Sequence, residues 1–306
     1  MGLFHYTSNV GLTGILHSKC LFATNYKYLN DSEEMNMARP LIIPVFEKDF
    51  ESEATVLIAE GHLRDTMLKD HGRGIYKQEA NNLLNAAVET ADRLAPVFIT
   101  SFCTHDEPTY QWRHGLLSQW RAYGSKGGCA IEFDREKMVA MFDLEGETYR
   151  YNQVALKDVV YENYDQVLDV SKLSGLARLV LRKMVLGEEV GDEANELYYA
   201  ISFAAPQMKH RSFSEERETR VIASLVKSKT NYSDASKKPR SVFYRDKEGL
   251  PCPTIRLLEG FDQLPIKRVI IGPQRNQDQV AYAVNMALEQ YGITAGVVLS
   301  EIPYVP

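Results

Sequence analysis

The 306-residue sequence predicts an α+β fold, with a mixed sheet as its core and a single domain over residues 1–306. Three observations lead to this class. Short β-prone runs alternate with segments of helical period along the chain. Strands are predicted at both ends and in the middle, so the sheet must combine segments that are distant in sequence. A helical block at about 170–210 is then expected to pack around that sheet.

The start of the chain predicts a strand, a helix and a second strand. The run FHYTS is β-prone, and Ser8 is a suitable N-cap for the helix that follows it. Apolar side chains recur in this helix at Val10, Leu12, Ile15 and Leu16, which is the spacing of one helical face. The run LFAT then predicts the second strand.

Two further helices are expected before the third strand. Asn30 and Asp31 can cap the first of them, which should end near Arg39 because Pro40 disfavours helical geometry in the residue before it. Residues 78–95 repeat the helical pattern of apolar side chains, and the run VFITSFC predicts the strand that follows.

The middle of the chain, QWRHGLLSQWRAYGSKGGCAIEFD, predicts a helix, a glycine turn and a strand. Leu116, Leu117, Trp120 and Tyr123 lie three or four residues apart, which places them on one helical face. Aromatic side chains at this spacing are more typical of a core than of a ligand platform, but Tyr123 ends the helix and is better placed to reach a cleft. Asp134 is expected to cap the next helix.

Strands dominate the remainder of the chain after the helical block. Alternation from Glu218 onward places Glu218 and Arg220 on one face of a strand, and Thr219 and Val221 on the other. Residues 227–250 are polar, basic and turn-rich, which is typical of an extended hairpin. The last runs, RVIIG, QDQVAYAVNMALEQYG and ITAGVVLS, predict strand, helix and strand.

The composition indicates a cytoplasmic protein with no membrane partner. A net charge of -6 and a sequence pI near 5.7 argue against a surface built to hold polyphosphate. The four cysteines are far apart, which favours neither a disulfide framework nor a structural zinc site. The chain has no secretory leader pattern, and no apolar run approaches the roughly 18 residues that a membrane span requires.

Common catalytic motifs are missing from the sequence. It has no dinucleotide-binding glycine motif, P-loop, zinc-protease helix or nucleophile elbow. Cys103 and His105 have a C-x-H spacing, but two ligands are too few for zinc, so no metal is expected. A metal-dependent nuclease finds little support, because no acidic constellation stands out.

Several separated runs resemble a bacterial domain family of unknown function, over nearly the whole chain. They are the HYTS opening with Asn30 and Asp31 downstream, the W-x-x-Y before a glycine turn and strand, the E-x-E-x-R run, and SEIPY near the end. The sequence departs from that family at Ser32, where proline is more common, and at Val305, where arginine is common.

The strand, short helix and second strand at the start also resemble the beginning of the ADP-ribosyltransferase fold. This resemblance implies that NAD is a substrate, that a first-strand histidine holds a ribose, that aromatic side chains pack on nicotinamide, and that a late-strand glutamate completes the site. His5, Tyr123 and Glu218 reproduce this order. Tyr6 and Thr7, beside His5, are weaker candidates for the same binding role.

Glu218 and Glu216 are the expected catalytic residues under this resemblance. Cleavage of the nicotinamide–ribose bond develops positive charge on the ribose, which a neighbouring carboxylate stabilises. Glu218, at the start of a strand, is the first choice. Glu216 shares its face if the strand extends back, and would then orient an acceptor nucleophile. Arg220 would lower the pKa of the two carboxyl groups or contact the pyrophosphate.

Structural explanations stay open for the same residues. An E-x-E-x-R run on an exposed strand is often a salt-bridge ladder, and His5 is also compatible with a hydrogen-bonded structural role. The basic stretch Lys227–Lys247 includes Tyr232, Phe243 and Tyr244, and basic side chains among aromatic ones can hold single-stranded nucleic acid. A nucleic acid and a protein are therefore both candidate acceptors.

The sequence thus favours an NAD-consuming enzyme, either an ADP-ribosyltransferase or an NAD glycohydrolase. Its expected biological role is that of a toxin or a phage-defence effector. The alternative is a non-catalytic module of a bacterial defence or stress system that binds a nucleotide or a partner. Neither the acceptor nor the oligomeric state follows from the residues.

Overall fold

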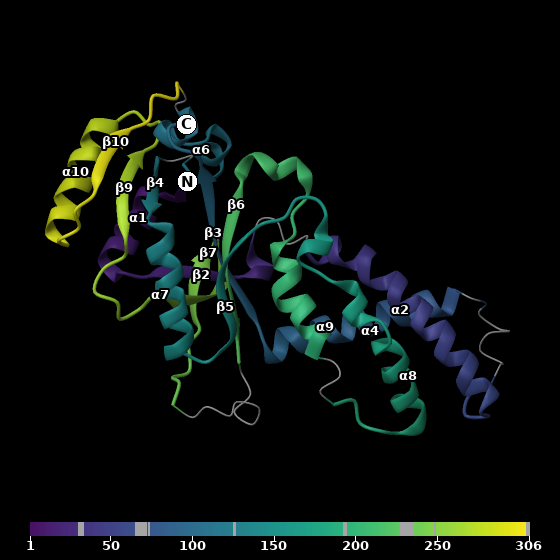
Figure 1. Cartoon of the computed structure of the whole chain (residues 1–306). Coiled ribbons are helices and arrows are strands. Elements are labelled where there is room, and N and C mark those ends of the chain that lie inside the picture. The colour runs from purple at the N-terminus through teal and green to yellow at the C-terminus, as the bar shows by residue number, and fades with distance from the viewer. Residues whose placement is uncertain are drawn as a thin grey trace.

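The computed structural model describes residues 1–29, 34–64, 72, 74–124, 127–191, 195–226, 236–247 and 249–303. In these residues a ten-stranded sheet is packed against helices, and a bundle of helices extends from one side of it (Figure 1). The architecture is the mixed α+β class that the sequence predicts.

The sheet is mostly antiparallel, and among the described strands β9 and β10 form a parallel pair. The strand order is β10-β9-β4-β1-β3-β2-β8-β7, and β6 and β5 extend the sheet from β3. The strands are β1 (Gly2–Ser8), β2 (Leu21–Asn25), β3 (Val97–His105), β4 (Gly128–Phe133), β5 (Tyr151–Asp158), β6 (Glu218–Leu225), β7 (Phe243–Lys247), β8 (Leu250–Leu257), β9 (Ile266–Ile271) and β10 (Gly296–Leu299).

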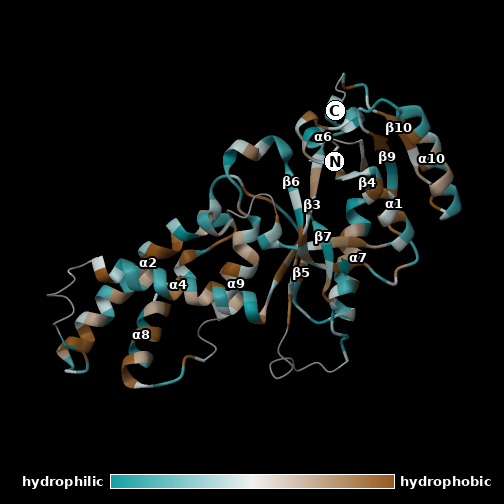
Figure 2. Ribbon diagram, turned by 180° about the vertical axis from the view of Figure 1, so that it is seen from behind, coloured by the Kyte–Doolittle hydropathy of each residue, from teal (hydrophilic) through white to brown (hydrophobic). Residues whose placement is uncertain are grey.

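One face of the sheet is covered by α1 (Asn9–Ser18), α7 (Arg135–Thr148) and α10 (Gln277–Gln290). Their apolar side chains share one core with every second residue of the central strands, and the strands form an apolar centre in Figure 2. Ser8 caps α1 by accepting from the Gly11 N–H, and Asp134 caps α7 by accepting from the Lys137 N–H, which confirms both predicted caps.

A second apolar core belongs to the helical bundle. It is formed mainly by α2 (Glu34–Ala59), α4 (Gly74–Leu94), α8 (Leu176–Leu186) and α9 (Asn195–Tyr199). The opposite face of the sheet also carries α5 (Tyr110–His114) and α6 (Leu117–Tyr123), and Trp120 of α6 is buried there against Tyr6. Because the apolar cluster of the bundle is separate from that beneath α1, α7 and α10, the single domain over residues 1–306 stays a prediction.

The prediction that the second helix ends near Arg39 is wrong. Helix α2 continues through Pro40 and Pro44 to Ala59. Each proline removes one backbone hydrogen bond, but the apolar stripe that includes Ile42 and Phe46 is buried against the bundle. Tertiary packing therefore overrides the local signal. The predicted Asn30–Asp31 cap lies outside the described residues.

The helical block at 170–210 is helical in part, but it is divided into short pieces. Gly175 and Gly187 lie on either side of α8 with φ of 85° and 73°, a conformation that glycine adopts at little cost. After α9 the chain forms a five-residue π-helix over Ala200–Ala204 and a 3₁₀ turn over Ala205–Gln207. The interruptions coincide with the two glycines and with Pro206, which supplies no backbone N–H donor.

The sheet is split beside β3, and this split creates the candidate site. Strand β6 pairs with one edge of β3 along residues 97–103. The other edge is shared: β1 pairs with residues 103–105, and β2 pairs with residues 98–99. Between these two short pairings, β1 and β2 diverge, and no described strand pairs with the backbone of residues 100–102 on that edge.

Candidate functional site

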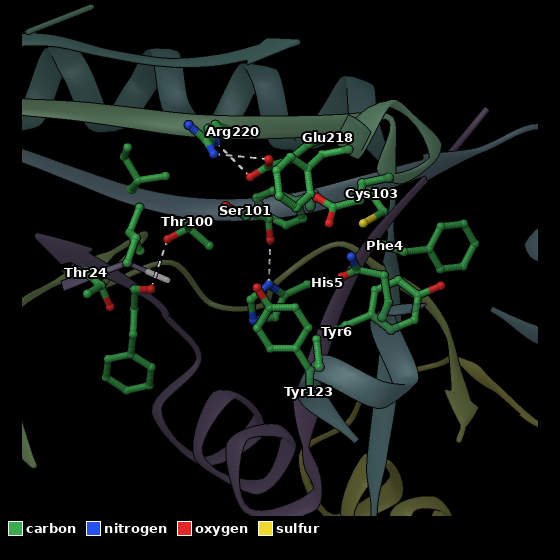
Figure 3. Close-up of a pocket in the computed structure, with 18 of the residues that line it drawn as sticks. Phe4, His5, Tyr6, Thr24, Thr100, Ser101, Cys103, Tyr123, Glu218 and Arg220 are labelled. Atoms are coloured by element: carbon green, nitrogen blue, oxygen red, sulfur yellow. Dashed lines mark hydrogen bonds and ion pairs between the residues drawn. The ribbon is translucent and has the colours of Figure 1, made fainter. Parts of the chain in front are cut away.

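A cavity of about 530 Å³ lies over the split in the sheet, within the size range of small-molecule sites. Its wall combines segments from the beginning, middle and end of the chain (Figure 3). The lining residues are Phe4, His5, Tyr6, Phe22, Thr24, Leu29, Ile99, Thr100, Ser101, Phe102, Cys103, Ser118, Gln119, Ala122, Tyr123, Lys209, Phe213, Glu216, Glu218, Arg220, Arg245, Asp246, Lys247, Cys252 and Thr254.

Side chains replace the missing backbone pairing at the split. His5 Nδ1 lies 2.9 Å from the Ser101 carbonyl oxygen, and the Thr100 hydroxyl donates to the Phe22 carbonyl oxygen at 2.9 Å. Alternation along β1 would turn His5 to the same face as Leu3, into the apolar core. The gap between β1 and β2 instead leaves the imidazole at the cavity wall.

The contact with Ser101 fixes the tautomer of His5. A carbonyl oxygen only accepts, so Nδ1 carries the proton and Nε2 keeps its lone pair. Burial lowers the pKa of His5, although the bond to Ser101 acts in the opposite direction. His5 is therefore a neutral side chain near pH 7 with an acceptor nitrogen, suited to a hydroxyl donor.

Glu218 lies in a buried network of four charged side chains. Arg220 Nε donates to Glu218 Oε1 at 2.7 Å, and Lys209 Nζ donates to Glu218 Oε2 at 3.0 Å. Lys209 also donates to Glu216 Oε2 at 2.8 Å, so it connects the two carboxylates. Arg220 is further held by the Pro206 carbonyl oxygen at 2.8 Å. The E-x-E-x-R run is thus not an exposed ladder.

The network keeps Glu218 ionised. Burial acts to raise the pKa of Glu218, but Arg220 and Lys209, together with hydrogen bonds from Arg220 and Ser101, outweigh it and hold the pKa below its ordinary value. Burial likewise acts to lower the pKa of Lys209, and Glu218 and Glu216 raise it overall. The cavity therefore contains a fixed carboxylate rather than a neutral carboxylic acid.

The two glutamates belong to different elements. Glu218 begins β6, as predicted, whereas Glu216 ends the 3₁₀ helix Arg211–Glu216 and is not on the strand. Arg217 between them has a φ of 43°, which is unusual for a residue with a side chain, and it forms an ion pair with Asp106 at 2.6 Å. This turn brings both carboxylates to Lys209, so they share the cavity without sharing a strand face.

Tyr123 is at the same cavity, as its position at the end of α6 suggested. Burial, together with the charges of Glu218 and Glu216, raises the pKa of Tyr123 to about 12. Its phenol thus stays protonated at neutral pH. Ser118, one turn earlier, lines the cavity with a buried hydroxyl oxygen that has no hydrogen-bond partner among the described residues.

Tyr6 and Thr7 lie differently with respect to the cavity, and their binding role stays a prediction. The Leu116 N–H donates to the Tyr6 oxygen at 2.8 Å, and the same hydroxyl is hydrogen-bonded to His105 Nε2 at 2.8 Å. Tyr6 lines the cavity, but its hydroxyl is already hydrogen-bonded to His105 and Leu116. Thr7 does not line the cavity, and its hydroxyl lies against Gly11 at the start of α1.

His105 makes stability depend on pH. Burial, then the charge of Arg217, lowers the pKa of His105 to about 4, against about 6.5 in an unfolded chain. The folded state therefore binds fewer protons, and stability is lost as pH falls below 6.5. We expect a loss of about 2 kcal/mol between pH 7 and pH 5 in urea unfolding. His105→Gln should flatten this dependence, and an unchanged slope would contradict the assignment.

Several lining residues were missed or only partly anticipated from the sequence. Lys209 stands at the end of the broken helical block and has no motif around it. Arg245 and Lys247 fall in the stretch read as a basic hairpin, where β7 and β8 do form antiparallel strands. Their clustering with aromatic side chains was the available signal, but it did not show that they face the same cavity as His5.

Other site types find no basis in the described residues. In the described part of the chain, no three or more His, Cys, Asp or Glu side chains gather as metal ligands would. No described helix has the length and apolar character to cross a membrane.

Residues 119–221 match the family described as "Protein of unknown function (DUF2971)". This stretch is about a third of the chain, and it includes Trp120, Tyr123, Glu216, Glu218 and Arg220 but not His5. It confirms the predicted resemblance to a domain family of unknown function. No curated protein and no solved structure matches the chain, and the resemblance to the ADP-ribosyltransferase fold stays a prediction.

Proposed function

We propose that the cavity binds NAD and that the protein cleaves the bond between nicotinamide and ribose. The observation that carries this proposal is the shared cavity of His5, Tyr123 and Glu218, which come from β1, α6 and β6. These three segments lie about a hundred residues apart in the sequence, and together they supply the three kinds of side chain that such a site needs. Their meeting is a stronger argument than their order along the chain.

The chemistry requires a negative charge beside the ribose. The bond between the nicotinamide nitrogen and ribose C1′ breaks, and nicotinamide leaves with the bonding electron pair. Positive charge then develops on the ribose, which the ionised Glu218 stabilises. The oxygen of water, or of an acceptor, bonds to C1′ and its proton is released. Water gives ADP-ribose, whereas another nucleophile gives an ADP-ribosylated product.

The other two side chains fit the remaining parts of NAD. His5 Nε2 accepts a hydrogen bond from a ribose hydroxyl, since its other nitrogen is held by Ser101. The Tyr123 ring offers an aromatic surface for nicotinamide, which carries a positive charge before cleavage. Glu216 lies across Lys209 from Glu218, where it can orient the attacking nucleophile.

One observation favours the second candidate function, a module that binds a nucleotide without cleaving it. Both Glu218 oxygens already accept hydrogen bonds from Arg220 or Lys209, so their charge is largely balanced inside the protein. A balanced carboxylate stabilises a neighbouring cation less than a free one does. The same cavity would then recognise NAD or a related nucleotide and pass the signal to a partner.

The deciding experiment measures nicotinamide released from NAD by the purified protein, with and without cellular extract as a source of acceptors. Release in buffer alone is expected of a glycohydrolase, and release that needs extract is expected of a transferase. Absence of release in both conditions, together with thermal stabilisation by NAD, would contradict cleavage and favour the binding module.

Glu216→Gln separates hydrolysis from transfer in the same assay. Glu218 keeps both of its cationic partners in this variant, so nicotinamide release in buffer should change little. Transfer to acceptors in the extract should fall by about tenfold or more, because the group that orients the acceptor loses its charge. An equal fall in both rates would show that Glu216 does not act on the acceptor.

A further inference from the structure

The part of the sheet made of β2, β8 and β7 has two chemically different faces. Ala23 and Ile255 point into the apolar core beneath α1 and α7. Phe22, Thr24 and Thr254 alternate with them and line the cavity, as do Cys252 and Arg245. Register supports this arrangement, since Arg245 pairs with Cys252 and Thr24 pairs with Thr254. The cavity therefore continues from β6 across the split to the edge strand β7.

Arg245 differs from the neighbouring arginines in having no acidic partner. Arg220 is paired with Glu218 at 2.7 Å, Arg240 with Glu145, and Arg256 with Glu259 at 3.0 Å. Within the described residues, Arg245 has no carboxylate within 4 Å, and its guanidinium lies over the Phe22 ring at 4.8 Å. The aromatic ring orients the guanidinium and leaves its N–H donors available for an anion.

Lys247 reinforces the positive charge at this end. It is two residues further along β7, on the same side as Arg245, and also lines the cavity. Its ammonium donates to the Tyr28 carbonyl oxygen at 2.6 Å, which holds it near the cavity. The cavity thus has Glu218 and Glu216 at one end, and at β7 it has Arg245 and Lys247 with Asp246 between them in sequence.

We propose that Arg245, aided by Lys247, binds a phosphate group of a ligand that extends across the split. This rests on the proposed function and specifies its substrate as a dinucleotide or another nucleoside diphosphate ester, rather than a free nucleoside. Strands β6 and β7 are four strand positions apart through β3, β2 and β8, which is roughly 19 Å at the usual spacing. A ligand with its sugar at Glu218 needs a diphosphate or a second nucleoside to reach Arg245.

The chemistry of Arg245 fits a phosphate. A guanidinium can donate two parallel hydrogen bonds to phosphate oxygens, and such charge-assisted bonds are stronger than neutral ones. The exposed position of β7 lets a strongly hydrated group reach it from solvent. The carboxylates at the other end repel phosphate, so the two ends of the cavity orient the ligand in one direction.

The test is titration calorimetry with ADP-ribose, using Arg245→Ala and the matched control Arg256→Ala. Arg256 lies over the Phe243 ring at 5.1 Å on the same hairpin, but it is paired with Glu259 and does not line the cavity. Both variants therefore lose an arginine stacked on phenylalanine. We expect Arg245→Ala to weaken ADP-ribose binding by about tenfold or more, and Arg256→Ala to change it by less than about twofold.

Adenosine, which has no phosphate, supplies the second arm. Its affinity should be equal for the wild type and Arg245→Ala, since the variant removes only a phosphate contact. Equal ADP-ribose affinities in the wild type and Arg245→Ala would overturn the proposal. So would a wild-type protein that binds neither probe.

The result is independent of cleavage. ADP-ribose lacks nicotinamide, so its binding is measured whether or not the protein releases nicotinamide from NAD. Selective weakening in Arg245→Ala without any nicotinamide release supports the phosphate site and contradicts the enzyme. Release of nicotinamide with unchanged ADP-ribose affinity in Arg245→Ala supports the enzyme and contradicts the phosphate site.

Discussion

Glu218→Gln is expected to lower nicotinamide release by about a hundredfold to a thousandfold. In the proposed reaction the ionised carboxylate stabilises charge that develops on the ribose, and removal of one such preorganised interaction has effects of this size. Glutamine keeps the shape of the side chain and part of its hydrogen bonding. The assay is the rate of nicotinamide release at saturating NAD, measured where the variant is still folded.

The same substitution also disturbs the buried network. Lys209 would keep Glu216 as a carboxylate partner, whereas Arg220 would lose its ion pair with Glu218, and loss of one member of a buried ion pair costs about 3 kcal/mol or more. Loss of activity through unfolding must therefore be separated from loss of chemistry. Circular dichroism and urea unfolding of the variant show whether it is folded under the conditions of the assay.

Glu132→Gln is the matched control for that separation. The exposed fraction of the side chain is 2% for Glu132 and 5% for Glu218, and each carboxylate is paired with an arginine. Glu132 is bound to Arg268 and does not line the cavity. We expect a similar loss of stability and unchanged nicotinamide release. If Glu218→Gln retained wild-type release, Glu218 would have only a structural role.

Arg240→Leu is expected to lower the free energy of unfolding by about 3–5 kcal/mol. The Glu145 side chain is fully buried, and Arg240 binds it through Nε and Nη2. Leucine would leave this carboxylate without its cation, which is the costly way to break a buried pair. The Arg240 guanidinium also lies 3.5 Å from the centre of the Tyr149 ring, a contact that leucine replaces only in part.

Urea unfolding of two further variants identifies the cause. Arg256→Leu changes an arginine whose side chain is 49% exposed, and it should alter stability by about 0.5 kcal/mol or less. The double variant Glu145→Leu with Arg240→Leu should be more stable than Arg240→Leu alone, because no unpaired charge stays buried. A double variant that is less stable than the single one would attribute the loss to packing.

Local signals in the sequence were sufficient for most of the elements that build the site. The Ser8 cap and the apolar spacing after it give β1, α1 and β2, and alternation from Glu218 gives β6 and its two faces. The end of the second helix was wrong because Pro40 is a local signal, whereas the burial of Ile42 and Phe46 depends on helices that are distant in sequence.

The position of His5 shows why the site itself was harder to predict. Strand alternation places His5 with Leu3, which is in the apolar core. Its access to the cavity depends on β1 and β2 pairing with different parts of β3, about 100 residues away for β1 and about 75 for β2. Arg245 was similarly recognised as basic, while its role at the far end of the cavity depends on the pairing of β8 with β2.

The way β3 is shared has a consequence for how the protein matures. Its partners β1, β2 and β6 are separated from it by about 70 to 120 residues, and contacts of this range form slowly. During synthesis on the ribosome, His5 is made early. Glu218 and Arg245, which line other parts of the cavity, are added more than 200 residues later. A nascent chain that has not passed residue 254 therefore lacks part of the cavity wall, and the proposed activity has to wait until that strand is made.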